Sequence, residues 1–98
     1  MNWAIGLLLT AGFEAALPHF ERALQLDPAA PGAHHAFGRA LATAGKWDEA
    51  IDEYEESLRL EPANGHAHLN LALALRERGR AAAAAVHFET ATRLGAGR

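Results

Sequence analysis

The chain has 98 residues, of which 50% are hydrophobic and 21% charged, a composition typical of one folded domain and not of a disordered chain. Its formal net charge is −3 at pH 7 with neutral histidines, which argues against a general nucleic-acid binder. The sequence contains no cysteine, so disulfides, thiolate chemistry and cysteine–zinc sites are excluded.

The chain begins with an apolar run from Met1 to Leu9. This run has no basic residues before it, and Thr10, Gly12 and Glu14 interrupt the apolar pattern soon after it. It is too short to span a bilayer and does not resemble a signal peptide. We therefore expect no membrane insertion and a cytoplasmic protein, with the periplasm left open. The excess of arginine over lysine and the many alanines are typical of a GC-rich bacterial genome.

The spacing of apolar residues predicts an all-α chain made of helix pairs. Breaks are expected at Ala11-Gly12, at Gly45 and at Gly79, and Glu61-Pro62 ends one helix because the residue before proline avoids the α region. Pro18 lies about one turn into a predicted helix and should bend it or remove a hydrogen bond. The predicted helices cover residues 1–10, 14–26, 33–43, 48–60, 65–78 and 82–94.

A period of 34 residues relates these pairs. Leucines, small residues and aromatic residues recur in register along the whole chain, which predicts three stacked units and one domain over residues 1–98. The units are 1–30 (shortened at its start), 31–64 and 65–98. The recurring columns are Leu7, Leu41 and Leu75; Ala16, Ala50 and Ala84; Phe20, Tyr54 and Phe88; and Leu26, Leu60 and Leu94.

This pattern resembles the tetratricopeptide repeat. In that family the first helix of a unit carries a large residue, a leucine, a small residue and a second large residue; the corresponding positions here are His34, Phe37, Gly38 and Leu41. The second helix carries a small residue, an aromatic residue, another small residue and a closing proline. The middle unit matches with Ala50, Tyr54, Ser57 and Pro62.

Three features depart from the family pattern. His34 and His68 occupy a position that is usually tryptophan, and Ala96 stands where the third unit should have its closing proline. No polar capping helix follows Leu94, although the ends of helical repeat arrays generally need one. The expectation is a segment of a longer array, or a chain whose ends associate.

The resemblance implies an α-α superhelix in which the first helix of each pair lines a concave groove. Leu69 and Leu73 share one helix face, and the alternative is that they pack on the preceding repeat as core. An acidic-apolar extended peptide or an amphipathic helix would suit such a groove. The groove positions predicted in this way are Ile5, Leu9, His35, Arg39, His66, Leu69, Leu73 and Arg76.

The predicted function is therefore protein–protein interaction, with a segment of an unidentified partner held in the groove. One alternative is self-assembly through the unprotected ends of the array, giving a homo-oligomer. Another is that the repeats recruit substrates for a larger protein. The end surfaces would lie near Trp3 and Leu7 on one side and near Ala83, Val86, His87 and Thr90 on the other.

No pattern in the sequence predicts catalysis, a metal or a cofactor. Adjacent histidines such as His34 and His35 point to different sides of a helix, and the carboxylates lie on an outer helix instead of in a cleft. Some tetratricopeptide repeats grip the carboxylate at the end of a chaperone tail. The positions that match this clamp are Met1, Ile5, Ala36, His66 and Asn70. They offer few hydrogen-bond donors, so we expect no recognition of a chaperone tail.

Overall fold

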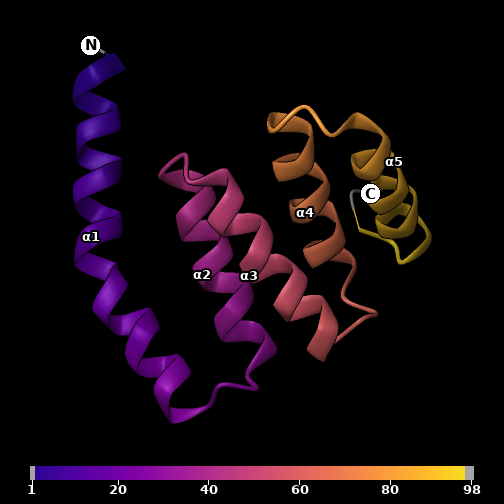
Figure 1. Cartoon of the computed structure of the whole chain (residues 1–98), viewed down its shortest axis with the longest axis horizontal. Helices are drawn as coiled ribbons and strands as arrows, with labels where there is room; N and C mark the ends of the chain where they lie inside the picture. The colour runs from indigo at the N-terminus through magenta and orange to yellow at the C-terminus, as the bar shows by residue number, and fades with distance from the viewer. Residues whose placement is uncertain (1, 97–98) are drawn as a thin grey trace.

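The computed structural model describes residues 2–96, with side chains described from residue 12 onward. Over this range the chain forms five α-helices joined by short turns, which stack into a curved array (Figure 1). The array is all-α, as the sequence predicted. The helices are α1 (Asn2–Leu26), α2 (Pro31–Thr43), α3 (Trp47–Leu60), α4 (Gly65–Glu77) and α5 (Ala81–Arg93).

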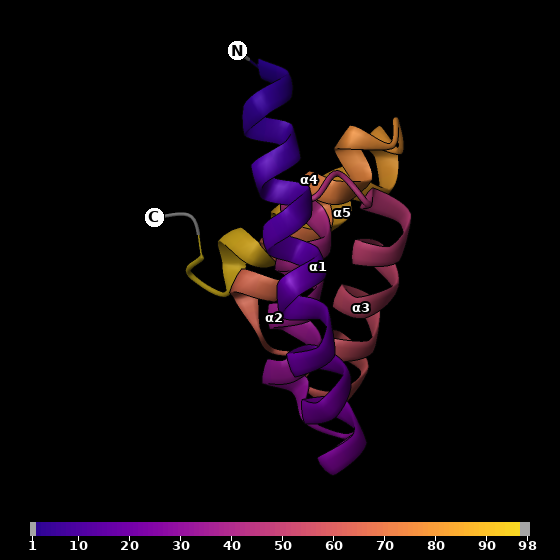
Figure 2. The same ribbon diagram turned by 90° about the vertical axis from the view of Figure 1, so that its left-hand side faces the viewer.

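Helices α2 and α3 form one antiparallel pair and helices α4 and α5 form the next, with α3 packed against α4. Their bounds agree with the predicted ones to within two residues. The view turned by 90° shows α1 lying along one side of the array (Figure 2). None of the helices in the described part of the chain is both long and apolar enough to cross a membrane.

The predicted break at Ala11-Gly12 is wrong, because α1 runs as one helix of 25 residues from Asn2 to Leu26. Gly12 keeps a negative φ, and a Cβ added to it would meet no atom within 4 Å, so no neighbouring element fixes a turn there. A glycine inside a helix costs only about 1 kcal/mol, which the rest of the helix can offset. The first unit therefore lacks a folded helix pair.

Pro18 also lies inside α1, and the helix continues through it. Its ring crowds the carbonyl of residue Glu14, four positions earlier, and its nitrogen donates no hydrogen bond. The ribbon of α1 changes direction between its upper and lower halves in Figure 1, as expected for a proline inside a helix.

In both helix pairs the first helix ends in the same motif at its C-terminus. Gly45 has φ 78° and Gly79 has φ 77°, the left-handed region that favours glycine. After α2, the amide of Lys46 donates to the carbonyl of Leu41 at 2.8 Å, which closes a Schellman motif. These glycines end α2 and α4 where the sequence predicted breaks.

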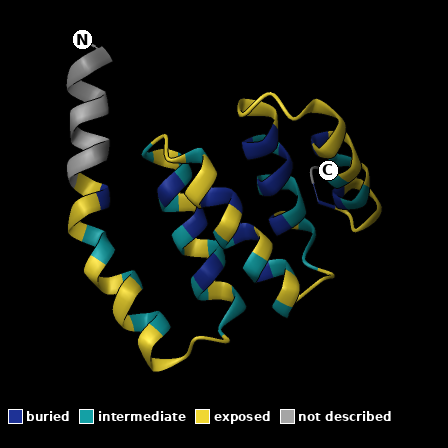
Figure 3. Ribbon diagram, viewed as in Figure 1, coloured by how far each residue is buried: buried dark blue, intermediate teal, exposed yellow. Residues whose placement is uncertain are grey.

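The core centres on the α2–α3 pair and on the face of α4 that packs against it (Figure 3). Tyr54 is 2% exposed and is the largest fully buried side chain among the residues that the structure describes. Small residues let the helices approach closely at Gly38, Ala50 and Ala72, all of which are buried. Leu41, Leu71 and Leu75 complete this part of the core.

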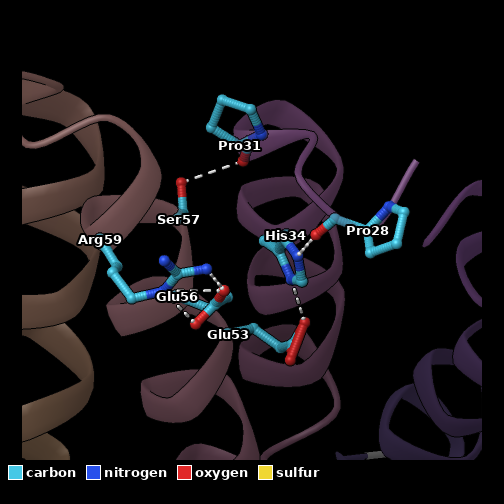
Figure 4. A network of polar contacts seen from close by, with 7 residues as sticks. All are labelled: Pro28, Pro31, His34, Glu53, Glu56, Ser57 and Arg59. Atoms are coloured by element: carbon cyan, nitrogen blue, oxygen red, sulfur yellow. Dashed lines mark hydrogen bonds and ion pairs between the residues drawn. The ribbon is translucent and has the colours of Figure 1, made fainter.

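A charged network joins α2 to α3 at the buried residue His34 (Figure 4). Its Nε2 lies 2.8 Å from the carbonyl oxygen of Pro28, and its Nδ1 lies 2.9 Å from the carboxylate of Glu53. Both partners only accept hydrogen bonds, so both ring nitrogens must donate and the ring is an imidazolium. Burial by itself lowers the pKa of His34, but the bonds to Pro28 and Glu53 outweigh it and raise the pKa above the usual 6.5.

The next repeat replaces this carboxylate with a second histidine. His68 donates from Nε2 to the carbonyl of Pro62 at 2.9 Å, and its Nδ1 lies 3.0 Å from Nδ1 of His87. Burial and the adjacent His68 lower the pKa of His87, while Glu55 acts in the opposite direction. Acid therefore stabilises the α2–α3 contact at His34 and weakens the α4–α5 contact at His87.

We expect Glu53→Gln to lower the free energy of unfolding by about 1 kcal/mol near pH 6 and by much less at pH 8. The His34 pKa is raised by folding, so its stabilisation is complete below pH 6.5 and is lost as the pH rises through the folded-state value. Urea unfolding followed by circular dichroism across this range measures the difference. Glu49→Gln, on the exposed face of α3, is the control and should parallel the wild type. A Glu53→Gln deficit that is the same at every pH would show that His34 is not charged.

Candidate functional site

Two adjacent cavities lie between α2 and α4, with volumes of about 270 Å³ and about 480 Å³. Arg39 and Asn70 line both of them, so the cavities form one continuous surface, called the groove below. The first cavity is otherwise mostly apolar and the second is polar. The first is completed by Ala42, Thr43, Trp47, Tyr54 and Leu73, and the second by His35, Asn64 and His66.

Helices α2 and α4 form the two walls of the first cavity, and α3 forms its floor. Tyr54 packs its ring into the core beneath α2 and also lines the cavity. Burial raises the pKa of Tyr54 to about 12, although the positive charge of Arg39 acts in the opposite direction. The phenol therefore keeps its hydrogen at neutral pH.

His35 connects the two walls of the groove. Its ring meets Tyr54 edge to face at 5.7 Å, and its Nε2 lies 2.8 Å from the side-chain nitrogen of Asn70 on α4. The amide nitrogen donates, so Nε2 accepts and the ring hydrogen sits on Nδ1. Burial lowers the pKa of His35, the charges of Arg39 and His66 lower it further, and Glu61 raises it. His35 is thus neutral at pH 7 in the free protein.

Four of the predicted groove residues come together in these cavities: His35, Arg39, His66 and Leu73. Leu69 is half-buried on α4 and lines neither cavity. The guanidinium of Arg76 lies 5.8 Å from the centre of the Phe88 ring, a cation–π contact toward α5. Ile5 and Leu9 lie outside the residues whose side chains the structure describes.

Two aromatic groove residues are not among the positions predicted from the sequence. The repeat pattern places Tyr54 only in the packing column of the second helix, and it assigns no role to Trp47. A sequence signal that could have identified Trp47 is its position two residues after the turn at Gly45, where α3 starts beside the end of α2. A large aromatic residue there is half-buried and faces the end of the groove.

The histidines diverge as their spacing predicted. His34 points to α3 and Pro28, whereas His35 lies in the groove. His68 contacts α5, whereas His66 lines the second cavity. In the described part of the chain, histidines and carboxylates form no group of three or more that would hold a metal ion.

The architecture is that of an α-helical repeat array, and comparisons with known proteins assign it to a family. Sequence models described as tetratricopeptide repeat match residues 35–98 and residues 12–53. The chain belongs to the tetratricopeptide repeat family. No curated protein matches the chain.

Solved structures of MamA share this fold. A structure of MamA from AMB-1 is 29% identical, has a TM-score of 0.81 and matches 97% of this chain and 53% of its own. One from MSR-1 is 28% identical, with a TM-score of 0.79, over 94% of this chain and 54% of its own. A further MamA structure is 25% identical, with a TM-score of 0.81, over 86% and 49%. The chain thus spans about half the length of these MamA chains.

Proposed function

We propose that this chain is a protein-interaction module that binds one short segment of a partner protein, as an extended peptide or a helix, in the groove. The observation that carries the proposal is the adjacency of the two cavities, which share Arg39 and Asn70. An apolar surface beside a few well-placed polar groups is the usual composition of a recognition site. The role is binding, and the groove needs no cofactor for it.

The first cavity would supply most of the affinity. Trp47, Tyr54 and Leu73 present aromatic and aliphatic surface there, and buried aromatic anchors dominate binding energy at most protein interfaces. His35 and Arg39 would orient the bound segment from the polar end. Leu69, on the same face of α4 as Leu73, and Arg76 extend the proposed surface beyond the cavities.

A displayed random-peptide library tests the proposal and needs no identified partner. Peptides selected on the wild-type chain should bind Leu73→Glu at least about tenfold more weakly, because the new carboxylate charges the apolar cavity. Leu26→Glu is the matched control, since Leu26 is 75% exposed on α1 and does not line the groove. Circular dichroism first establishes that both variants fold. Equal binding to all three proteins would remove the groove as the site.

A second candidate function is self-assembly through the last repeat. Val86 on α5 is 60% exposed and Leu94 is 44% exposed, beside exposed alanines of the same helix such as Ala83. Exposed apolar patches of this kind favour association. Light scattering over a range of concentrations should then show a rising mass that Val86→Glu abolishes, and a constant monomer mass would contradict this alternative.

A further inference from the structure

The second cavity differs from the rest of this acidic chain in the chemistry of its lining. All five residues around it carry N–H groups, and none is a carboxylate. The chain as a whole has a formal charge of −3. The lining combines one guanidinium (Arg39), two imidazoles (His35 and His66) and two side-chain amides (Asn64 and Asn70).

Hydrogen bonds hold the two amide side chains in place and leave some of their hydrogens free to donate to a ligand. The side-chain oxygen of Asn64 accepts from the amide of Ala67 at 3.1 Å, which fixes its side chain at the start of α4. Asn70 gives one hydrogen to Nε2 of His35, which places the ring hydrogen of His35 on Nδ1. Both amide hydrogens of Asn64 and one of Asn70 therefore remain for a ligand.

Arg39 is the charged member of the set. The ion pairs in the described part of the chain involve His34, Arg59, Arg78 and Arg93, and Arg39 belongs to none of them. Arg39 lines both cavities. Arginine binds carboxylates through two parallel hydrogen bonds, which few other side chains allow.

We propose that the second cavity receives the carboxylate of an aspartate or glutamate side chain of the partner segment, while an apolar residue beside it fills the first cavity. The inference rests on the proposed function and adds the chemistry of the partner. Since Arg39 and Asn70 line both cavities, the acidic and apolar residues of the segment stand within about three residues of each other. The recognised feature is thus a short acidic-apolar pair.

Binding of this carboxylate is coupled to protonation of His35. The titratable groups that shift the pKa of His35 are Arg39 on its own helix, His66 on α4 and Glu61 at the end of α3. The ring of Tyr54 also contacts the His35 ring. In the free protein, burial and the positive charge of Arg39 lower the pKa of His35 and favour the neutral imidazole.

A bound carboxylate brings an opposite charge that favours the imidazolium. The added proton goes to Nε2, which then donates to the side-chain oxygen of Asn70 after that amide turns over. Binding therefore takes up a proton and strengthens as the pH falls from 8 to 6.

Synthetic peptides test the carboxylate directly. The probes are acetylated and amidated peptides that contain one aspartate and one leucine separated by zero to three glycines, and the same peptides with asparagine. Trp47 lines the first cavity, so its fluorescence reports binding once the chain's other tryptophan is removed by Trp3→Phe. We expect at least one aspartate peptide to bind about five- to tenfold more tightly than its asparagine twin at pH 6.

The variant Arg39→Gln should abolish that preference, whereas Arg22→Gln, which removes the same charge from the exposed face of α1, should keep it. Calorimetry in two buffers of different ionisation enthalpy should show proton uptake by the wild type. The carboxylate site is overturned if aspartate and asparagine peptides bind equally, if Arg22→Gln acts as strongly as Arg39→Gln, or if no peptide binds at millimolar concentration. Equal binding of the aspartate and asparagine peptides, lost for both in Leu73→Glu, would overturn the carboxylate site while leaving the groove function intact.

Discussion

Replacing Tyr54 with alanine should lower the free energy of unfolding by about 3–5 kcal/mol. Tyr54 is 2% exposed, and its ring fills the space between α2 and α3 and also contacts His35. The loss combines the transfer energy of a large aromatic side chain with the cavity left behind. A domain of this size is stable by only about 5–15 kcal/mol, so the variant should unfold at a much lower urea concentration.

Phe88 provides the matched control, because it occupies the same column in the last repeat. Within the described residues α5 packs against α4 alone, and Phe88 is half-buried. Phe88→Ala should therefore cost clearly less than Tyr54→Ala when both are measured by urea unfolding in the same buffer. Equal losses would mean that burial in the middle of the array does not set the cost of removing an aromatic ring.

The local part of the fold was predictable because its signals lie close together in the sequence. The 34-residue period and the turns at Gly45 and Gly79 placed α2 to α5 to within two residues. The sequence Thr-Ala-Gly occurs both at residues 43–45 and at residues 10–12, yet only Gly45 adopts a positive φ. Packing with the rest of the chain decides whether this tripeptide forms a turn or stays helical. The periodicity of the sequence carries no information about that packing.

The candidate site was predictable in outline but not in detail. Helical spacing put His35 and Arg39 on one helix face, and in the structure both residues line the same cavities as Leu73 or His66. It does not distinguish Leu69 from Leu73, although only Leu73 lines a cavity, because the tilt between neighbouring helices decides which turn of α4 faces α2. Tyr54 could not be predicted for a different reason: its column is a core column, whereas the edge of its ring reaches the groove.

Equivalent positions of the second and third repeats show how a substitution changes the polar contacts between two helices without changing the fold. His34 and His68 each donate a hydrogen bond to the carbonyl of the proline six residues before them. Their second partners differ, since Glu53 in one repeat corresponds to His87 in the next. One architecture therefore holds two helix pairs with opposite responses to acid.

Gly38→Ala should destabilise the chain by about 1–3 kcal/mol, even though alanine is favoured over glycine inside a helix by about 1 kcal/mol. A Cβ on Gly38 would lie 2.7 Å from both Cδ1 and Cε1 of Tyr54, closer than real contacts allow, so either the buried ring or the backbone of α2 must shift. The equivalent residue of the next repeat is Ala72, whose ring neighbour in the column is the half-buried Phe88. Glycine is thus required only where the tyrosine is tightly enclosed.

Gly32→Ala in the same helix is the control for Gly38→Ala. A Cβ there would meet no atom within 4 Å, so this change should leave stability unchanged or raise it by up to about 1 kcal/mol. The double variant Gly38→Ala/Tyr54→Leu separates the clash from the backbone effect, because leucine removes the ring atoms that the new methyl group meets. Its loss of stability should be smaller than the sum of the two single losses. Strict additivity in urea unfolding would mean that the Tyr54 ring is not what excludes a side chain at position 38.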